Sequence, residues 1–367
     1  MKVAFADIKA TYQRLKPELD AAYARVMDSG RYILGEEVEA FEKEFASFCG
    51  AGHCVAVANG LEALELILKG YGIGAGDEVI VPANTYIATW LAVTNVGARP
   101  VPVEPDLKTY NLDPARVPKA ITPKTRAILA VHLYGLPAEM DKLEEIASRH
   151  RLLIIEDAAQ AHGARYRGRT AGNLGQAAAF SFYPTKNLGA FGDAGAVVTN
   201  DAQLAEKARL LRNYGSQDKY QHLIPGGNSR MDPLQAAFLR VKLKRLEQWN
   251  RERLEEAVIY GERLGGLGNL VLPKVPEWCE PCWHQFVVRS SQREKLKLSL
   301  EQAGIETMIH YPIPPHLSAA YSHLKYKAGD FPLTEEISDT GLSLPLGLQL
   351  SSGAQDYVID GIIKALK

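Results

Sequence analysis

The chain of 367 residues lacks a long apolar run: no stretch approaches the ~20 consecutive apolar residues that a helix needs to cross a bilayer. Its N-terminus, Met1 to Asp7, lacks the apolar core of a secretory signal. It also lacks an excess of charge, because 42 Lys and Arg face 43 Asp and Glu, for a net charge of −1. We therefore expect a cytoplasmic protein with no membrane and no nucleic-acid partner. A near-neutral charge opposes self-association only weakly, so it is compatible with an oligomer.

Cysteine is scarce, with four residues in the whole chain. Cys279 and Cys282 form a C-x-x-C pattern with His284 two residues on, which is open to interpretation as half of a zinc site or as a redox pair. A structural zinc site of this kind needs a second ligand pair at a similar spacing. Cys49 and Cys54 are spaced differently and lie in a distant segment, so we expect free thiols and no metal.

What the chain does contain is an alternation of short apolar runs with amphipathic helical patterns over its first two thirds. Continuous apolar runs separated by helices are typical of a parallel sheet covered on both faces. The expected strands are 53–58, 78–81, 100–103, 127–131, 152–155, 178–183 and 196–199. The sequence therefore predicts an α/β fold with a mainly parallel sheet.

The pattern changes after Asp201, where the segments 202–213 and 232–264 look helical and charged. The second is long enough to connect two domains. From about Gly265 onward, glycines, prolines and short strands such as 285–289 indicate a smaller α+β unit. We predict a large domain over residues 1–245 and a small C-terminal domain over residues 246–367.

Two chemically distinctive residues follow expected strands, where ligands of open α/β sheets bind. Asp157 ends the run 152–156, and it could bind a metal, orient a histidine, pair with a protonated ring nitrogen or simply cap a following helix. Lys186 lies in a turn flanked by apolar residues and glycines. A partly desolvated lysine has a lowered pKa and can act as a nucleophilic amine, although most loop lysines are solvated.

Two further features lie at strand ends. Gly60 joins a strand to a helix, so the backbone N–H groups of the helix start could hold an anion, or Gly60 could be a plain turn residue. Tyr86 follows the strand 78–81 and could stack on a flat ring or pack in the core. A lysine, an acid, an aromatic face and a phosphate cup are together what pyridoxal phosphate (PLP) requires.

In the order Gly60, Tyr86, Asp157, Lys186, the sequence resembles the fold-type-I, aspartate aminotransferase-like PLP enzymes, and specifically the sugar aminotransferases of the DegT/DnrJ/EryC1/StrS family. The resemblance covers nearly the whole chain. It is carried by the segments 30–35 (GRYILG), 81–86 (VPANTY), 131–135 (VHLYG), 156–163 (EDAAQAHG), 180–189 (FSFYPTKNLG), 228–232 (NSRMD) and 310–312 (HYP).

The resemblance implies a role for each candidate residue. Lys186 would form the Schiff base with PLP and move protons, and Asp157 would keep the pyridine nitrogen protonated. Gln160 would bond the ring hydroxyl, and Tyr86 would stack on the ring face. The phosphate would be held by Gly60, Leu61 and Ser181, together with Asn228 from the partner subunit of a homodimer. Arg230 is the implied site for the carboxylate of the amino donor. Many relatives have a hydroxyl residue on each side of the phosphate-loop glycine, whereas this chain has Asn59 and Leu61.

The resemblance also indicates a substrate. The segment 181–189 resembles that of 3-keto enzymes, whereas 4-keto enzymes more often have histidine at the place of Tyr183; segments 212–216 and 218–220 agree with the 3-keto group. We expect glutamate to donate an amino group to a nucleotide-linked, dTDP-type 3-keto-6-deoxyhexose. Tyr183, His310, Tyr311 and His316 are the expected sugar contacts.

Other interpretations stay open at this point. They are a 4-keto sugar aminotransferase, a PLP-dependent sugar dehydrase, a regulatory protein without turnover and an aminotransferase for ordinary amino acids. The dehydrases of the family carry histidine in place of the lysine, so Lys186 argues against that class.

Overall fold

The computed structural model describes residues 1–218 and 220–366, so Lys219, in one of the segments quoted above, lies outside the described residues. The α-helices are α1 (Ile8–Arg14), α2 (Lys16–Ser29), α3 (Glu36–Cys49), α4 (Gly60–Gly70), α5 (Ile87–Asn95), α6 (Met140–His150), α7 (Ala202–Leu211), α8 (Pro233–Leu243), α9 (Leu246–Leu264), α10 (Arg293–Gln302), α11 (Pro332–Thr340) and α12 (Ser352–Leu366). Short 3-10 helices are η1 (Val117–Ala120), η2 (Leu133–Gly135), η3 (Pro315–Leu317) and η4 (Ala319–Leu324).

The strands are β1 (His53–Val57), β2 (Glu78–Pro82), β3 (Arg99–Val103), β4 (Thr125–Val131), β5 (Leu153–Asp157), β6 (Arg165–Tyr166), β7 (Arg169–Thr170), β8 (Ala177–Ser181), β9 (Gly195–Thr199), β10 (Ser216–Asp218), β11 (Gln221–His222), β12 (Cys279–Glu280), β13 (Phe286–Arg289) and β14 (Gly341–Leu344). The main sheet has the order β1-β9-β8-β5-β4-β2-β3. Within it β9 alone is antiparallel to its neighbours, so the prediction of an α/β fold with a mainly parallel sheet is confirmed.

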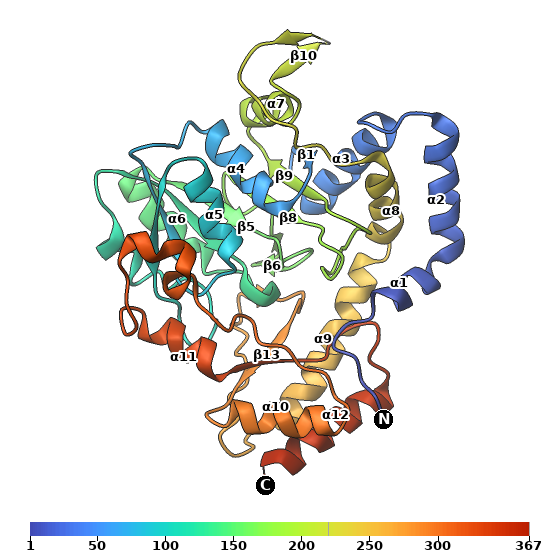
Figure 1. The fold of residues 1–367 in the computed structure, drawn as a ribbon, viewed down its shortest axis with the longest axis vertical. Coiled ribbons are helices and arrows are strands. Elements are labelled where there is room, and N and C mark those ends of the chain that lie inside the picture. The colour runs from blue at the N-terminus through green and yellow to red at the C-terminus, as the bar shows by residue number, and fades with distance from the viewer. Residues whose placement is uncertain (219, 367) are drawn as a thin grey trace.

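Side chains of the sheet alternate between two apolar cores, as the two-residue period of a strand requires. In β1, Cys54 and Ala56 pack with α3 and α8, whereas Val55 and Val57 pack with α4, α5 and α7. Helices therefore cover both faces of the sheet, which is why its strands read as continuous apolar runs (Figure 1). The coverage leaves the carboxyl ends of the parallel strands as the place for a site.

A third apolar core joins α9, α10 and α12 to the two-stranded sheet of β13 and β14, below the main sheet in Figure 1. Val3 belongs to this core and pairs with Ile305, so the first residues of the chain pack on its C-terminal part. The boundary at residues 245 and 246 falls between α8 and α9 and stays a prediction.

The prediction of one continuous helix over residues 232–264 was wrong, because the chain forms two helices with a break at Lys244 and Arg245. The N–H of Arg245 bonds three residues back to the carbonyl of Lys242 (2.9 Å), which tightens the turn. Helix α8 packs on α2 and α3, whereas α9 packs on α12. The helical path must therefore change direction as it passes between the two layers.

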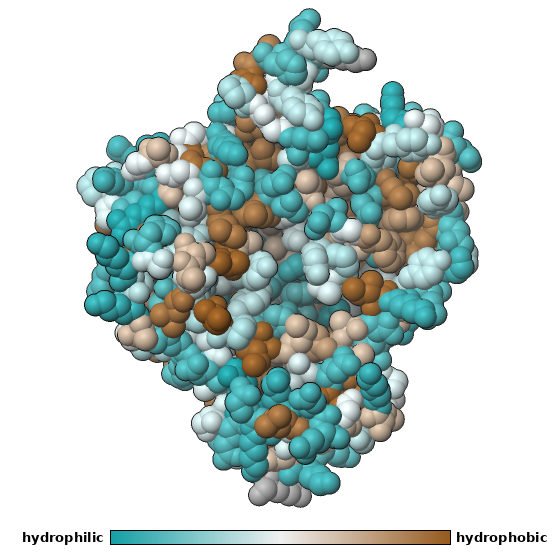
Figure 2. Space-filling model, in the orientation of Figure 1, coloured by the Kyte–Doolittle hydropathy of each residue, from teal (hydrophilic) through white to brown (hydrophobic). Residues whose placement is uncertain are grey.

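None of the helices within the described residues is long and apolar enough to span a bilayer. The face in Figure 2 is hollowed near its centre, between the main sheet and the C-terminal layer. Exposed apolar and aromatic side chains occur along α2 and the segment that follows it, where Tyr23, Met27, Tyr32 and Ile33 are 41–52% exposed.

Candidate active site

Lys186 occupies a tight loop after β8. Its backbone N–H donates to the carbonyl of Tyr183 (2.8 Å), and the carbonyl of Phe182 accepts from Ala190 (2.7 Å). Burial lowers the pKa of Lys186 to about 8, although the Asp157 carboxylate opposes that shift. At pH 7 about a tenth of this amine is therefore neutral, far more than for an ordinary lysine, and the neutral form is the one that can attack a carbonyl.

Asp157 is the last residue of β5 and is 7% exposed. Its Oδ2 accepts from the Thr89 hydroxyl (2.8 Å) and its Oδ1 from the N–H of Ala159 (3.2 Å), and it forms no ion pair with any described residue. No helix begins after it, so helix capping is not its role. Burial raises the pKa of Asp157 because no cation lies close enough to compensate fully.

Asp157 therefore provides a test of whether PLP fits. A buried carboxylate without a close cation is stabilised by a cationic hydrogen-bond donor. A protonated pyridine nitrogen is such a donor, so the residues at the end of β5 fit the cofactor.

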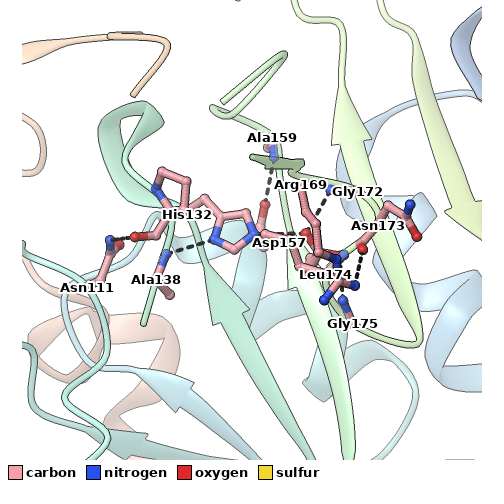
Figure 3. Close-up of polar contacts among 12 residues, drawn as sticks. Asn111, His132, Ala138, Asp157, Ala159, Arg169, Gly172, Asn173, Leu174 and Gly175 are labelled. Atoms are coloured by element: carbon pink, nitrogen blue, oxygen red, sulfur yellow. Dashed lines mark hydrogen bonds and ion pairs between the residues drawn. The ribbon is translucent and has the colours of Figure 1, made fainter. Parts of the chain in front are cut away.

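The support behind Asp157 comes from His132 and Glu156, which are both fully buried. The N–H of Ala138 donates to Nδ1 of His132 (3.1 Å), so the ring proton lies on Nε2 and points to Glu156 (2.9 Å). The backbone of His132 also donates to the carbonyl of Asp157 (3.1 Å). Figure 3 shows the His132 ring lying between Ala138 and β5.

Glu156 also accepts three backbone N–H groups, from Gly172, Leu174 and Gly175, at 2.7–2.8 Å. Burial alone raises the pKa of Glu156, but the bonds from His132 and the backbone outweigh it and lower the pKa below its ordinary value. An anion held by four donors fixes the end of β5, and with it the position of Asp157 (Figure 3).

The start of α4 fits a phosphate group. Asn59 caps the helix by accepting from the N–H of Glu62 (2.9 Å), and its carbonyl accepts from Ala63 (3.0 Å). The N–H groups of Gly60 and Leu61 have no partner among the described residues, so they are available to an anion. A Cβ on Gly60 would lie 2.7 Å from Cβ of Ser181, so glycine is needed for the two segments to approach.

Gln160, Tyr311 and Tyr86 form one polar and aromatic group. Oε1 of Gln160 accepts from the N–H of Tyr134 (2.6 Å), and its Nε2 donates to the Tyr311 hydroxyl (2.9 Å). One amide proton of Gln160 remains for a ring hydroxyl. Tyr86 is 54% exposed, which rules out a core role, and its ring lies 5.1 Å from that of Tyr311.

The expected sugar contacts are placed in different ways. Tyr183 is 54% exposed, beside Lys186 in the chain. His310 bonds to Ser343 (2.8 Å), and burial, followed by the nearby Lys186, lowers its pKa to about 4, so it is neutral. His316 is buried against Glu335 (3.0 Å) and the ring of Phe331, and none of its described contacts involves Lys186 or Asp157.

Asn228 and Arg230 lie on the segment that returns from the β10–β11 hairpin, which projects from the body in Figure 1. Asn228 is exposed, and Nη1 of Arg230 donates to Oδ1 of Asn213 (2.8 Å). Ser229 between them accepts from the N–H of Ala58 (3.4 Å), close to the start of α4. Ser229 therefore anchors the segment just after β1, while the side chain of Asn228 beside it stays exposed.

Sequence reasoning missed Thr89, His132, Glu156 and Asn187. Strand alternation offered one signal, since Glu156 must face away from Asp157 and a buried glutamate needs donors. Thr89 offered none, because its partner lies 68 residues away. The C-x-x-C pattern was also assigned to no role: Cys279 and Cys282 are buried free thiols, and no cluster able to hold a metal occurs in the described part of the chain.

Known proteins resemble this chain in sequence and in fold. A dTDP-3-amino-3,4,6-trideoxy-alpha-D-glucose transaminase of Streptomyces venezuelae is 54% identical over 98% of this chain and 95% of its own length. A dTDP-3-amino-3,6-dideoxy-alpha-D-galactopyranose transaminase of Aneurinibacillus thermoaerophilus is 49% identical over 98% of both chains. The crystal structure of S. venezuelae DesV in complex with a ketimine intermediate is 54% identical, has a TM-score of 0.98, and the match covers 100% of this chain and 99% of that one.

Residues 13–363 match the DegT/DnrJ/EryC1/StrS aminotransferase family. The two relatives and the shared fold agree with this family match. The chain belongs to the DegT/DnrJ/EryC1/StrS aminotransferase family and is a PLP-dependent aminotransferase.

Proposed function

We propose that the enzyme transfers the amino group of glutamate to carbon 3 of a dTDP-linked 3-keto-6-deoxyhexose, giving a 3-amino-3,6-dideoxyhexose. The observation that carries the chemistry is the pairing of a desolvated Lys186 with a buried Asp157 that lacks an ion pair. The choice of carbon 3 is supported by the names of the two relatives above, which both specify a dTDP sugar with its amino group at carbon 3.

The residues that would hold PLP each offer a matching group. The free N–H groups of Gly60 and Leu61, with the Ser181 hydroxyl, would bind the phosphate, and Asp157 would bind the ring nitrogen. Tyr86 would cover the ring face, and Gln160 would donate its remaining amide proton to the ring hydroxyl. When bound, PLP supplies an electron-withdrawing ring that makes the carbon-bound proton of the donor removable.

Lys186 would carry out the proton transfers. Its amine would take the proton from the α-carbon of the donor and hold it, and it would return a proton to the carbon of the sugar that receives the nitrogen. A pKa of about 8 suits both directions, because the group exchanges protons readily near neutral pH. We expect Lys186→Ala to abolish transamination, since it removes the covalent attachment and the proton carrier together.

The donor carboxylate would bind to Arg230. The guanidinium of Arg230 lies over the Tyr214 ring, with Cζ 5.3 Å from the ring centroid, and its Nη1 donates to Asn213. These two contacts fix the orientation of the guanidinium. Its Nε is buried without a partner in the described structure, so it has a proton to offer. The planar fork suits a carboxylate, and Arg230→Lys should therefore raise the KM for glutamate about tenfold with little effect on the sugar.

We further propose a homodimer with shared active sites. The projecting β10–β11 hairpin and the exposed side chains along α2 support an interface. Asn228 would reach the partner's phosphate site, and Arg230 on the same segment would bind the donor in the partner's site. Mixing Lys186→Ala chains with Arg230→Ala chains should restore activity, because some mixed dimers would contain one intact site. Verified mixed dimers without any recovery would contradict shared sites.

The experiment for the reaction itself uses matched substrates. Purified enzyme is given [15N]glutamate with dTDP-3-keto- or dTDP-4-keto-6-deoxyglucose, and NMR locates 15N in the sugar product. We expect nitrogen on carbon 3 with the first substrate and slow or no turnover of the second. Amination at carbon 4 alone would support the 4-keto alternative and overturn the regiochemistry.

A further inference from the structure

The C-x-x-C-x-H pattern of residues 279–284 has no part in the function proposed above, yet it touches the active site at two points. The Cys282 carbonyl accepts from Nδ2 of Asn187 (2.8 Å), next to Lys186 in the chain. The Cys282 thiol donates to the carbonyl of Gln160 (3.3 Å), in the loop after Asp157. One buried residue thus connects the loop of the lysine to the loop of the carboxylate.

The close approach of this segment depends on Gly135. Its φ of +89° favours glycine, and an added Cβ would lie 2.7 Å from the backbone nitrogen of His284 and 2.8 Å from the Cys282 sulfur. The carbonyl of Gly135 accepts from the N–H of Cys282 (3.0 Å), and that of Tyr134 accepts from Gln285 (3.3 Å). The backbone of residues 134 and 135 therefore holds the segment 282–285 in place, independently of its contact with Asn187.

Hydrogen bonds to carbonyl groups determine which way the amides point. The carbonyl of His162 can only accept, so the group of Asn250 that faces it (2.7 Å) is Nδ2, and Oδ1 of Asn250 faces Asn187 (3.0 Å). Asn187 consequently directs Nδ2 at two acceptors, the Asn250 oxygen and the Cys282 carbonyl. Its Oδ1 must then face the ring of His284.

The same logic assigns the proton of His284. Nδ1 lies 3.2 Å from Oδ1 of Asn187, which can only accept, so Nδ1 carries the proton. Burial, followed by the positive charges of Lys186 and Arg253, lowers the pKa of His284 well below its usual range. The ring is therefore neutral, with its single proton on Nδ1 and a bare Nε2.

We propose that His284 is a positioning residue of the active site: through its Nδ1 proton it fixes Asn187 and thereby the loop that presents Lys186. The inference rests on the proposed role of Lys186. It assigns the C-x-x-C-x-H segment to holding the two cofactor-binding loops in register, where the sequence left a metal or redox site open.

The test exploits the shapes of two amides. In His284→Asn the side-chain amide can place an N–H where Nδ1 lies, whereas in His284→Gln it can place one where Nε2 lies. We expect His284→Asn to keep kcat within about threefold of the wild type. We expect His284→Gln and His284→Ala to lower kcat roughly 10- to 100-fold, as misplacement of a reacting group does, while the KM for the sugar changes less than about twofold.

Two readouts are independent of turnover. NMR of protein labelled with [15N]histidine should show His284 protonated on Nδ1 and still neutral at pH values where an ordinary histidine is charged. The pH titration of the cofactor's visible absorbance should shift in His284→Gln and stay at the wild-type position in His284→Asn. His150→Gln, on the exposed last turn of α6, is the matched control.

The outcomes separate the proposals. The role of Nδ1 would be overturned if His284→Gln kept the wild-type kcat while His284→Asn lost it, or if NMR found the proton on Nε2. If His284→Ala does not fold, the comparison of the two amide variants decides alone. If wild-type enzyme does not carry its cofactor on Lys186, the proposed function fails first, and that result is read from the wild type without any His284 variant.

Discussion

Thr89→Val replaces the hydroxyl that donates to Asp157 by a methyl group and leaves the volume of the side chain almost unchanged. Thr89 is 1% exposed, and its hydroxyl lies 2.8 Å from Oδ2 of Asp157 and 2.8 Å from the hydroxyl of Thr85. Burial already raises the pKa of Asp157, and the Thr89 bond is the largest of the contacts that oppose this. Without that bond the carboxylate is ionised less readily. It therefore stabilises a protonated ring nitrogen less.

The size of the effect follows from the kind of bond that is lost. A hydrogen bond to a charged group contributes about 1.5–3 kcal/mol. If all of that supports the transition state, kcat falls about 10- to 150-fold at 1.36 kcal/mol per tenfold. The acidic limb of the pH–kcat profile should also move to higher pH, because Asp157 must be ionised and now loses its proton less readily.

The assay is steady-state amino transfer from glutamate between pH 5 and 9, with Thr94→Val as the control. Thr94 lies on the same helix, α5, and its hydroxyl bonds to Trp90 (3.1 Å) and Tyr321 (3.2 Å) without touching Asp157. Both variants lose one hydroxyl. Equal kcat values and superimposable pH profiles for the two would refute the argument that Thr89 acts on Asp157.

Three further predictions follow from neighbouring contacts. Capture of PLP by the apoenzyme should accelerate as pH rises through about 8, because only the neutral Lys186 amine reacts; a stopped-flow absorbance rate that stays flat from pH 6 to 9 would contradict the lowered pKa. Gly60→Ala should raise the dissociation constant of PLP at least about tenfold, since its Cβ would meet that of Ser181 at 2.7 Å, whereas Gly261→Ala, with open space around it, should leave that constant unchanged in equilibrium dialysis. Glu156→Gln should lower the free energy of unfolding by about 3 kcal/mol in urea titrations, because a buried anion with four donors is lost; a change below ~0.5 kcal/mol would argue against its anchoring role.

The sequence was most informative about elements whose signal is local. Apolar runs located the strands of the sheet, and Gly60 located the start of α4. Because parallel strands end at one edge of a sheet, the strand pattern alone predicts that Asp157 and Lys186 lie near each other. The break between α8 and α9 was missed because it depends on which layer each helix packs against, and periodicity carries no record of that.

Contacts between distant segments were the part that sequence could not supply. Thr89 meets Asp157 across 68 residues, and Asn187 meets His284 across 97. The Cys282 pattern suggested chemistry of its own, whereas its carbonyl and thiol act as hydrogen-bonding groups. His316 was among the expected sugar contacts, and its described partners are Glu335 and Phe331.

The central claim is that Lys186 carries the cofactor and the chemistry. Holoenzyme treated with borohydride, digested and mapped by mass spectrometry tests it most directly. The account predicts a single modified peptide with the reduced cofactor on Lys186, and none in Lys186→Ala protein. A label on Lys242, which lies in the same part of the fold and whose pKa burial lowers to about 7, or on any other lysine, would contradict it.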